Sequence, residues 1–311
     1  MPTTAHDART ASRRGFAFGA LGVVIFALTL PMTRLAVGDA TDPQLPPVFV
    51  TAGRAAVAGL LSLLLLWQQR AFHRRSRPER RHWLPLAVSA FGTVLGFPMC
   101  IALALREVDA MHAAVVTGAL PLATAIVAAL ALRQRPSAGF WVCALLGCAL
   151  VLVFAVWQGS GRLSAADGWL LLAVVTAAVG YVGGARVAAE MPAQQVICWV
   201  LVGSLPFTLP VMLLTWPDTT AAPVRVSAWL GFAYAALFSM WLGFFAWYRG
   251  LALGGVVRVS QVQLLQPFLA LLFAVPVLGE KLEPVTVLFS LAVLAVVFVG
   301  RRMPVREVAT T

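Results

Sequence analysis

"VSQVQLLQPFLALLFAVPVLGEKLEP", residues 259–284, is an apolar stretch that carries three glutamines and a proline near its start. A glutamine amide in hydrocarbon costs free energy unless it is hydrogen-bonded, and a proline inside a helix removes a backbone hydrogen bond. Amides beside a helix break are typical of a membrane helix that faces the interior of a helical bundle. This stretch therefore indicates a helical membrane protein, provided that the rest of the chain is equally apolar.

The composition of the whole chain supports that interpretation. Apolar residues make up 60% and charged residues 11% of the 311 positions, and the mean hydropathy is +0.88. Soluble domains are usually about half apolar and a quarter charged, so a water-soluble fold could not bury this much apolar surface. The alternation typical of a membrane β-barrel is absent from the sequence. The chain is therefore predicted to be an all-α, polytopic membrane protein.

The apolar residues fall into runs that match the thickness of a bilayer. A helix needs about 20 apolar residues to cross the hydrocarbon. Ten runs are predicted to be transmembrane helices: 16–33, 47–67, 83–105, 112–132, 140–158, 168–185, 196–216, 228–248, 256–278 and 285–300.

The basic residues predict how these helices are oriented. With the N-terminus inside, 17 arginines fall in cytoplasmic segments, whereas five basic residues fall on the opposite side. This asymmetry predicts that both termini are cytoplasmic, in the inner (cytoplasmic) membrane, and that the number of spans is even. The net charge of +11 is thus explained by topology, with the lipid bilayer and not a nucleic acid as the partner.

An internal repeat divides the chain into two related halves. A shift of 146 positions places Pro121 on Pro267 and aligns residues 118–132 with residues 264–278. Because each half has five spans, an odd number, the halves are predicted to cross the membrane with opposite orientation, as in many secondary transporters. The predicted parts are an N-terminal tail (1–15), a first repeat (16–158), a second repeat (168–300) and a C-terminal tail (301–311).

The sequence resembles the drug/metabolite transporter superfamily, of the EamA-domain type with two five-helix repeats. The segments that carry the resemblance are "FVTAGRAAVAGLL" (49–61), "VVTGALPLATAIVAALAL" (115–132) and "LLQPFLALLFAVPVLGEKLEP" (264–284). The family commonly has a glutamate just after the fourth span, where this chain reads Leu132-Arg133-Gln134-Arg135, so a carboxylate remains only at Glu280. The resemblance implies efflux or exchange of small metabolites, amino acids or drugs through a central cavity.

The ninth span supplies the first candidate binding residues. Ser260, Gln263 and Pro267 share one helical face, and Gln266 lies beside Pro267. In the matching part of the fourth span, Thr117 and Pro121 form a smaller polar patch. One interpretation is a substrate site at a broken helix, and the alternative is that the glutamines hydrogen-bond neighbouring helices.

Arg54 is the one charged residue that these boundaries place well inside a span. Because an intramembrane arginine is costly, it needs a partner or a hydrated cavity. Arg54 is therefore predicted to bind an anionic group of a substrate, such as a carboxylate. The alternatives are that it anchors its helix at the outer interface or that it pairs with Asp39 or Asp42 in the preceding loop.

Aromatic residues give a further set of candidates. In the eighth span, five aromatic side chains share one helical face: Tyr234, Phe238, Trp241, Phe245 and Tyr248. They either form an aromatic wall for a flat substrate or pack between helices and at the interface. Tyr181 and Trp199 are two more candidates for the wall of the cavity.

Several patterns are missing. The sequence has no P-loop, no metal-binding cluster and, by these boundaries, no acidic residue deep in a span, so no cofactor, metal or proton relay is predicted. The chain is predicted to be a secondary-active transporter that exports a small molecule by alternating access, and not an enzyme. The alternatives are a lipid enzyme built around His112, Asp109 and Glu107, or a non-transporting membrane subunit. A homodimer stays open as an assembly.

Overall fold

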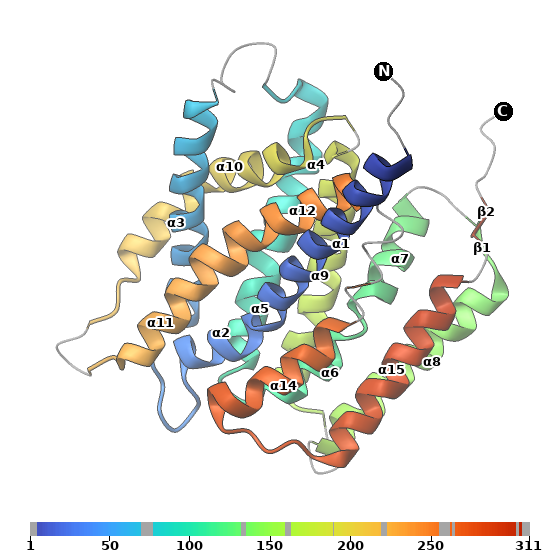
Figure 1. The fold of residues 1–311 in the computed structure, drawn as a ribbon. Helices are drawn as coiled ribbons and strands as arrows, with labels where there is room; N and C mark the ends of the chain where they lie inside the picture. Colours follow the sequence, from blue (N-terminus) through green and yellow to red (C-terminus); the bar gives the residue numbers. More distant parts are fainter. Residues whose placement is uncertain are drawn as a thin grey trace.

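The computed structural model describes residues 5–69, 77–131, 135–158, 163–188, 190–218, 223–254, 262, 265–302 and 305–306 (Figure 1). The elements of the first half are α1 (Ala5–Ala27), α2 (Thr29–Val37), α3 (Pro47–Gln68), η1 (Arg80–His82), α4 (Trp83–Ser89), η2 (Ala90–Gly96), α5 (Phe97–Ala104), α6 (Ala110–Thr117), α7 (Leu120–Ala131), β1 (Arg135–Pro136) and α8 (Ala138–Gln158). Those of the second half are α9 (Ala165–Ala188), α10 (Ala193–Leu214), α11 (Val226–Tyr234), η3 (Ala235–Leu242), α12 (Gly243–Gly254), α14 (Gln266–Leu278), α15 (Pro284–Arg302) and β2 (Val305–Arg306).

Most of the predicted spans coincide with helices of the right length. Among the described residues, eight helical segments are long and apolar enough to cross a membrane: Arg13–Val37, Pro47–Gln68, Arg80–Ala104, Ala110–Ala131, Ala138–Gln158, Ala165–Ala188, Gln194–Leu214 and Val226–Gly250. The predicted ninth and tenth spans correspond to shorter apolar helices, Gln266–Leu278 and Pro284–Gly300. The all-helical, multi-pass architecture is therefore confirmed, whereas the number of ten spans stays a prediction.

The outer surface of the bundle is apolar, as a bilayer requires. Leu145 on α8 is 71% exposed and Leu214 at the end of α10 is 85% exposed. Large apolar side chains are also exposed along α3, α9 and α15. A soluble monomer rarely leaves such a continuous apolar surface in water, so these faces lie against acyl chains.

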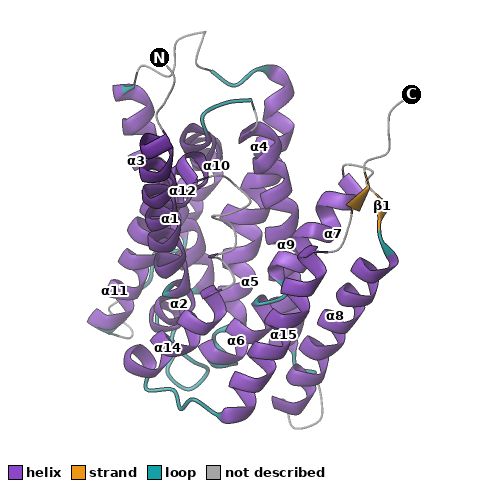
Figure 2. Cartoon of the chain, turned by 45° about the vertical axis from the view of Figure 1, so that its right-hand side comes forward, coloured by secondary structure: helices purple, strands orange, loops and turns teal. Residues whose placement is uncertain are grey.

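The two halves are interleaved (Figure 2). The first helix of each half packs antiparallel against the third span of the other half: α1 lies along α12, and α9 lies along α4, η2 and α5. In the same way α3 packs against α10, and α8 packs against α15 at one edge of the bundle (Figure 1). The two-residue strands β1 and β2 pair antiparallel at the ends of α8 and α15.

Glycines allow close approach at both contacts between the first span of one half and the third span of the other. A Cβ added to Gly250 on α12 would lie 2.8 Å from the Cα of Gly19 on α1. A Cβ added to Gly180 on α9 would lie 2.8 Å from the backbone nitrogen of Thr93 and 2.9 Å from the Cα of Gly92. Small residues at these contacts let helix backbones approach closely, which is the usual basis of helix association in membranes.

We expect Gly180→Val to destabilise the protein by about 1–3 kcal/mol, because its added carbons meet the backbone of η2, which cannot rotate away. Gly168→Val is the matched control on the same helix, since nothing lies within 4 Å of a Cβ at that position. Thermal unfolding of the purified variants measures the difference. Equal unfolding temperatures for the two variants would contradict this packing.

Candidate functional site

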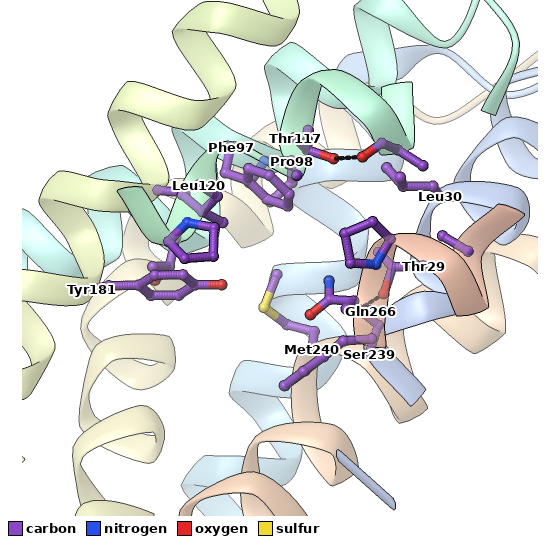
Figure 3. A pocket seen from close by; sticks show the side chains of 18 of the residues that line it. Thr29, Leu30, Phe97, Pro98, Thr117, Leu120, Tyr181, Ser239, Met240 and Gln266 are labelled. Atoms are coloured by element: carbon purple, nitrogen blue, oxygen red, sulfur yellow. Dashed lines mark hydrogen bonds between the residues drawn. The ribbon is translucent and has the colours of Figure 1, made fainter. Parts of the chain in front are cut away.

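A cavity of about 80 Å³ lies between the two halves. Its wall is formed by residues of α1, α2, α3, η2, α5, α6 and α7 from the first half and of α9, η3, α12, α14 and α15 from the second. Figure 3 shows side chains from both halves directed into this space, among them Thr29, Tyr181 and Gln266. Six of the predicted site residues line the cavity: Arg54, Thr117, Pro121, Tyr181, Gln266 and Pro267.

Helices are interrupted where they meet the cavity. The first span is divided at Leu28 between α1 and α2, and the fourth at Gly118 and Ala119 between α6 and α7. Helix α14 begins at Gln266, directly before Pro267. Irregular backbone at membrane depth is tolerated where it lines a cavity, so these breaks identify the interior of the bundle. Because residues 263 and 264 lie outside the described part of the chain, the break predicted next to Gln266 and Pro267 stays a prediction.

Two π-helical segments also reach the cavity. η2 and η3 interrupt the third and eighth spans, and they contribute Thr93 from η2 and Ser239 and Met240 from η3. A π-helical turn contains about one residue more than an α-helical turn, so side chains beyond it point in a new direction. Such segments frequently occur at functional sites.

Arg54 is the charged group of this cavity. Its side chain lies inside the bundle, only 4% exposed, and its Nη2 donates to the Ser239 hydroxyl oxygen at 2.9 Å. Within the described part of the chain, no carboxylate lies at ion-pair distance from Arg54, and its Nε has no hydrogen-bond partner. The interpretation that Arg54 pairs with a loop aspartate is wrong. The Asp39 carboxylate lies 3.9 Å from Arg34, and Asp42 pairs with Arg225 at 2.6 Å.

Ser239 connects Arg54 to a second helix of the first half. Its hydroxyl lies 2.8 Å from the Thr29 hydroxyl (Figure 3). Together with the bond from Arg54, this gives a hydrogen-bonded chain from α3 through η3 to α2. No specific pattern in the sequence selects Thr29, Thr93 or Ser239. The signal was present only as short polar side chains inside apolar runs, which on their own are more often bonded to their own helix.

Three predicted residues lie elsewhere. Trp199 lines a separate groove with Trp83, at an edge-on ring distance of 6.2 Å. Tyr234 donates its hydroxyl to the Ile25 carbonyl oxygen, and Trp241 donates its indole N–H to Ser62. The predicted aromatic face assumed an uninterrupted α-helix, and η3 breaks that period between Tyr234 and Gly243. Ser260 and Gln263 lie outside the described residues.

A buried histidine–carboxylate pair joins the halves at the start of α6 and α9. His112 Nε2 lies 2.7 Å from an Asp167 carboxylate oxygen, and the side chains are only 4% and 3% exposed. The other oxygen of Asp167 accepts from the Ser164 backbone N–H and hydroxyl. Asp167 belongs to the first turn of α9, which begins at Ala165, three residues before the predicted boundary at 168. The buried carboxylate therefore lies at the end of the helix and not deep inside the span.

Because His112 is bonded to Asp167, it does not form the cluster with Asp109 and Glu107 that a lipid enzyme would require. Asp109 lies 3.8 Å from Arg34, and its side chain is 64% exposed. Glu107 is exposed in the turn that precedes α6. Among the described residues, His112 is thus bonded to Asp167 on the opposite half and not to its neighbours in the sequence.

Glu280 caps the first turn of α6 from the other half. Gly279 ends α14 with a positive φ of 72°, which glycine adopts without strain. This turn places the Glu280 carboxylate 2.8 Å from the Ala110 N–H and 2.9 Å from the Met111 N–H. Desolvation raises the pKa of Glu280, and the two backbone N–H groups oppose that shift. The carboxylate noted after the ninth span thus closes a contact between the halves.

We expect Glu280→Ala to lower stability by about 0.5–2 kcal/mol, the usual range for a lost N-terminal cap, because it removes the acceptor of both N–H groups. Glu283→Ala, three residues further along the same loop and exposed, serves as the control. Stability of the wild type should also fall as the pH rises from the ordinary range of a glutamate through the raised pKa of Glu280, because the folded state holds its proton longer.

That slope with pH should be missing from Glu280→Ala and present in Glu283→Ala. The measurement is the unfolding temperature of the purified protein across this pH range. Identical pH profiles for the wild type and Glu280→Ala would rule out this role of the carboxylate.

The fold and the cavity define a multi-pass membrane transporter, and the comparisons with known proteins agree. The sequence profile of the EamA-like transporter family matches residues 13–156 and again residues 164–300. The chain belongs to the EamA-like transporter family.

Two relatives and one solved structure are similar over most of their length. The uncharacterized transporter YdeK of Bacillus subtilis is 43% identical over 290 residues, which are 93% of this chain and 97% of YdeK. The uncharacterized transporter sll0355 of Synechocystis is 24% identical over 258 residues, 76% of each protein. A crystal structure of a protein with 18% sequence identity superposes with a TM-score of 0.61 and covers 94% of this chain and 96% of its own, which shows the shared fold.

Proposed function

We propose that the protein is a secondary-active exporter of a small metabolite, amino acid or drug, located in the cytoplasmic membrane with both termini inside. The observation that carries the proposal is the cavity between the halves, which both halves line with interrupted helices and polar side chains. Substrate would be exchanged between the two sides by rocking of one half against the other, without a covalent step.

The packing pattern supports two related halves of opposite orientation. Each of the first five predicted spans can be exchanged for its counterpart among the last five. Under this exchange, the contact of α1 with α12 becomes the contact of α9 with α4, η2 and α5. The same exchange turns the contact of α7 with α9 into that of α14 with α1 and leaves α3–α10 and α8–α15 unchanged. An arrangement that survives this exchange has two equivalent packings available, which alternating access requires.

Irregular helices repeat at the same spacing. Shifting η2 (Ala90–Gly96) by the 146 positions of the sequence repeat gives 236–242, which lies within η3 (Ala235–Leu242). The same shift takes the start of α7, Leu120, to the start of α14, Gln266. The spacing of the sequence repeat therefore matches the spacing between the positions at which each half departs from regular α-helix.

The experiment that tests the proposal is flux in sealed proteoliposomes that contain the purified full chain. We would load vesicles with radiolabelled amino acids, organic acids, nucleobases and amines in turn, with and without a pH gradient. Saturable exchange of at least one compound, absent from protein-free vesicles, is the expected result. No flux with any compound, together with copurification of a partner subunit, would instead favour a non-transporting membrane subunit.

A further inference from the structure

We infer that the substrate presents a carboxylate to Arg54, with a small apolar body in contact with the apolar residues of the cavity wall. This inference rests on the proposed transport function and names the chemical class of its substrate. It excludes cationic drugs, which the proposed function alone leaves open.

The first argument is the charge of Arg54. A guanidinium has five N–H donors and stays protonated, so burial leaves both its charge and its donors to be satisfied. The observed partner, the Ser239 hydroxyl, is neutral and takes one donor. Within the described residues no carboxylate compensates the charge, and Nε has no partner. A bound carboxylate would satisfy both requirements, because it matches the planar fork of the guanidinium.

The second argument is that the other polar groups of the cavity are neutral. The described lining contains hydroxyls of Thr29, Thr93 and Tyr181 and the amide of Gln266, but no acidic side chain. Helix α14 begins at Gln266, so its partially positive end also lies at the cavity wall. The local field therefore favours a single negative charge and opposes an ammonium group.

The remaining lining determines the rest of the ligand. Phe26, Phe97 and Phe244 join Leu30 and Met240 in the cavity wall, which gives it a mainly apolar surface. Its small volume admits a compact body and not an extended one. A phosphate dianion would keep one charge unpaired on a single guanidinium, so the monoanionic carboxylate is the better match.

Binding at Arg54 would also affect the contact between the halves. A carboxylate that binds side-on would use the unpartnered Nε and the second N–H of Nη2, the group that also donates to Ser239. A substrate that draws the guanidinium toward itself weakens the chain from Arg54 through Ser239 to Thr29. Substrate charge and helix contact thus compete for one side chain, which gives a physical route from binding to rearrangement.

The test uses matched probes on the purified full chain, because a ligand that binds the folded state raises the unfolding temperature. The probes are benzoate, phenyl phosphate, benzyl alcohol and benzylamine, with propionate, propanol and propylamine as a smaller set. We expect a carboxylate to raise the unfolding temperature of the wild type and of the control Arg225→Gln, whose guanidinium pairs with Asp42 in the loops. The corresponding alcohol and amine should have no effect.

Arg54→Gln should abolish the carboxylate response, and Arg54→Lys should retain part of it. The partial response of the lysine variant would show that the glutamine variant fails through loss of charge and not through misfolding. A response to the amine, the alcohol or phenyl phosphate alone would overturn the inference and leave the transport proposal intact. A carboxylate response that persists in Arg54→Gln, or no response to any probe, would overturn it too. Failure of the transport proposal is recognised separately, by the absence of flux in proteoliposomes.

Discussion

In the Arg54→Leu variant, we expect transport to fall at least about tenfold while the unfolding temperature stays the same or rises. A lost contact between a buried cation and a substrate charge is worth about 2 kcal/mol or more, and 1.4 kcal/mol is tenfold in rate or affinity. Leucine avoids the cost of burying a charge in the membrane, and the shorter side chain borders an existing cavity, so the folded protein should not be destabilised. Flux of the compound identified in proteoliposomes and thermal unfolding measure the two effects.

The combination of results distinguishes binding from anchoring. If Arg54 serves mainly to hold η3 through Ser239, then Arg54→Leu should lose stability and retain flux in proportion to the folded protein. Ser239→Ala removes that hydrogen bond and leaves the charge in place, so it should weaken flux much less than Arg54→Leu does. A normal flux in Arg54→Leu would remove this residue from the site.

The second large effect is expected at the His112–Asp167 pair. His112→Leu should destabilise the protein by about 3–5 kcal/mol, because it leaves the Asp167 carboxylate buried without its partner from the other half. Thermal unfolding measures the loss. The double variant with leucine at both positions should recover most of it, since an apolar pair of similar volume is often as stable as a buried ion pair.

His82→Leu is the matched control for this prediction. His82 also faces a carboxylate, Glu190, at 2.9 Å, but the Glu190 side chain is 43% exposed and solvent can replace the partner. The hydrogen bond from His82, assisted by Arg81, lowers the pKa of Glu190, as expected for a solvated carboxylate with donors nearby. A similar loss for His82→Leu and His112→Leu would show that burial of the pair does not matter.

Much of the architecture could be predicted from the sequence because the membrane restricts the solutions. Apolar runs of spanning length leave few alternatives to a helix, and eight of the ten predicted spans are confirmed by length and composition. A buried charge and a proline beside amides are costly in lipid, so Arg54, Gln266 and Pro267 pointed inward, as the cavity lining shows.

The residues that were missed have equally physical reasons. An aromatic face containing Tyr234 and Trp241 requires the α-helical period of 3.6 residues, and η3 changes that period inside the span. Ser239 lines the cavity because of this shift, which composition does not reveal. Asp167 was placed outside the sixth span because a carboxylate looks like a boundary until its partner, His112, is seen 55 positions away in the chain.

The most direct test of two halves that alternate around the cavity is the accessibility of Thr117 from each side of the membrane. Thr117→Cys, in a variant that lacks Cys100, Cys143, Cys148 and Cys198, would be exposed to a membrane-impermeant thiol reagent in right-side-out and inside-out vesicles. We expect modification from both sides of the membrane. A transported compound should raise the rate from one side and lower the rate from the other. Leu145→Cys, on the lipid face of α8, should not be modified. Modification of Thr117→Cys from one side only, or from neither, would contradict the alternation of the two halves.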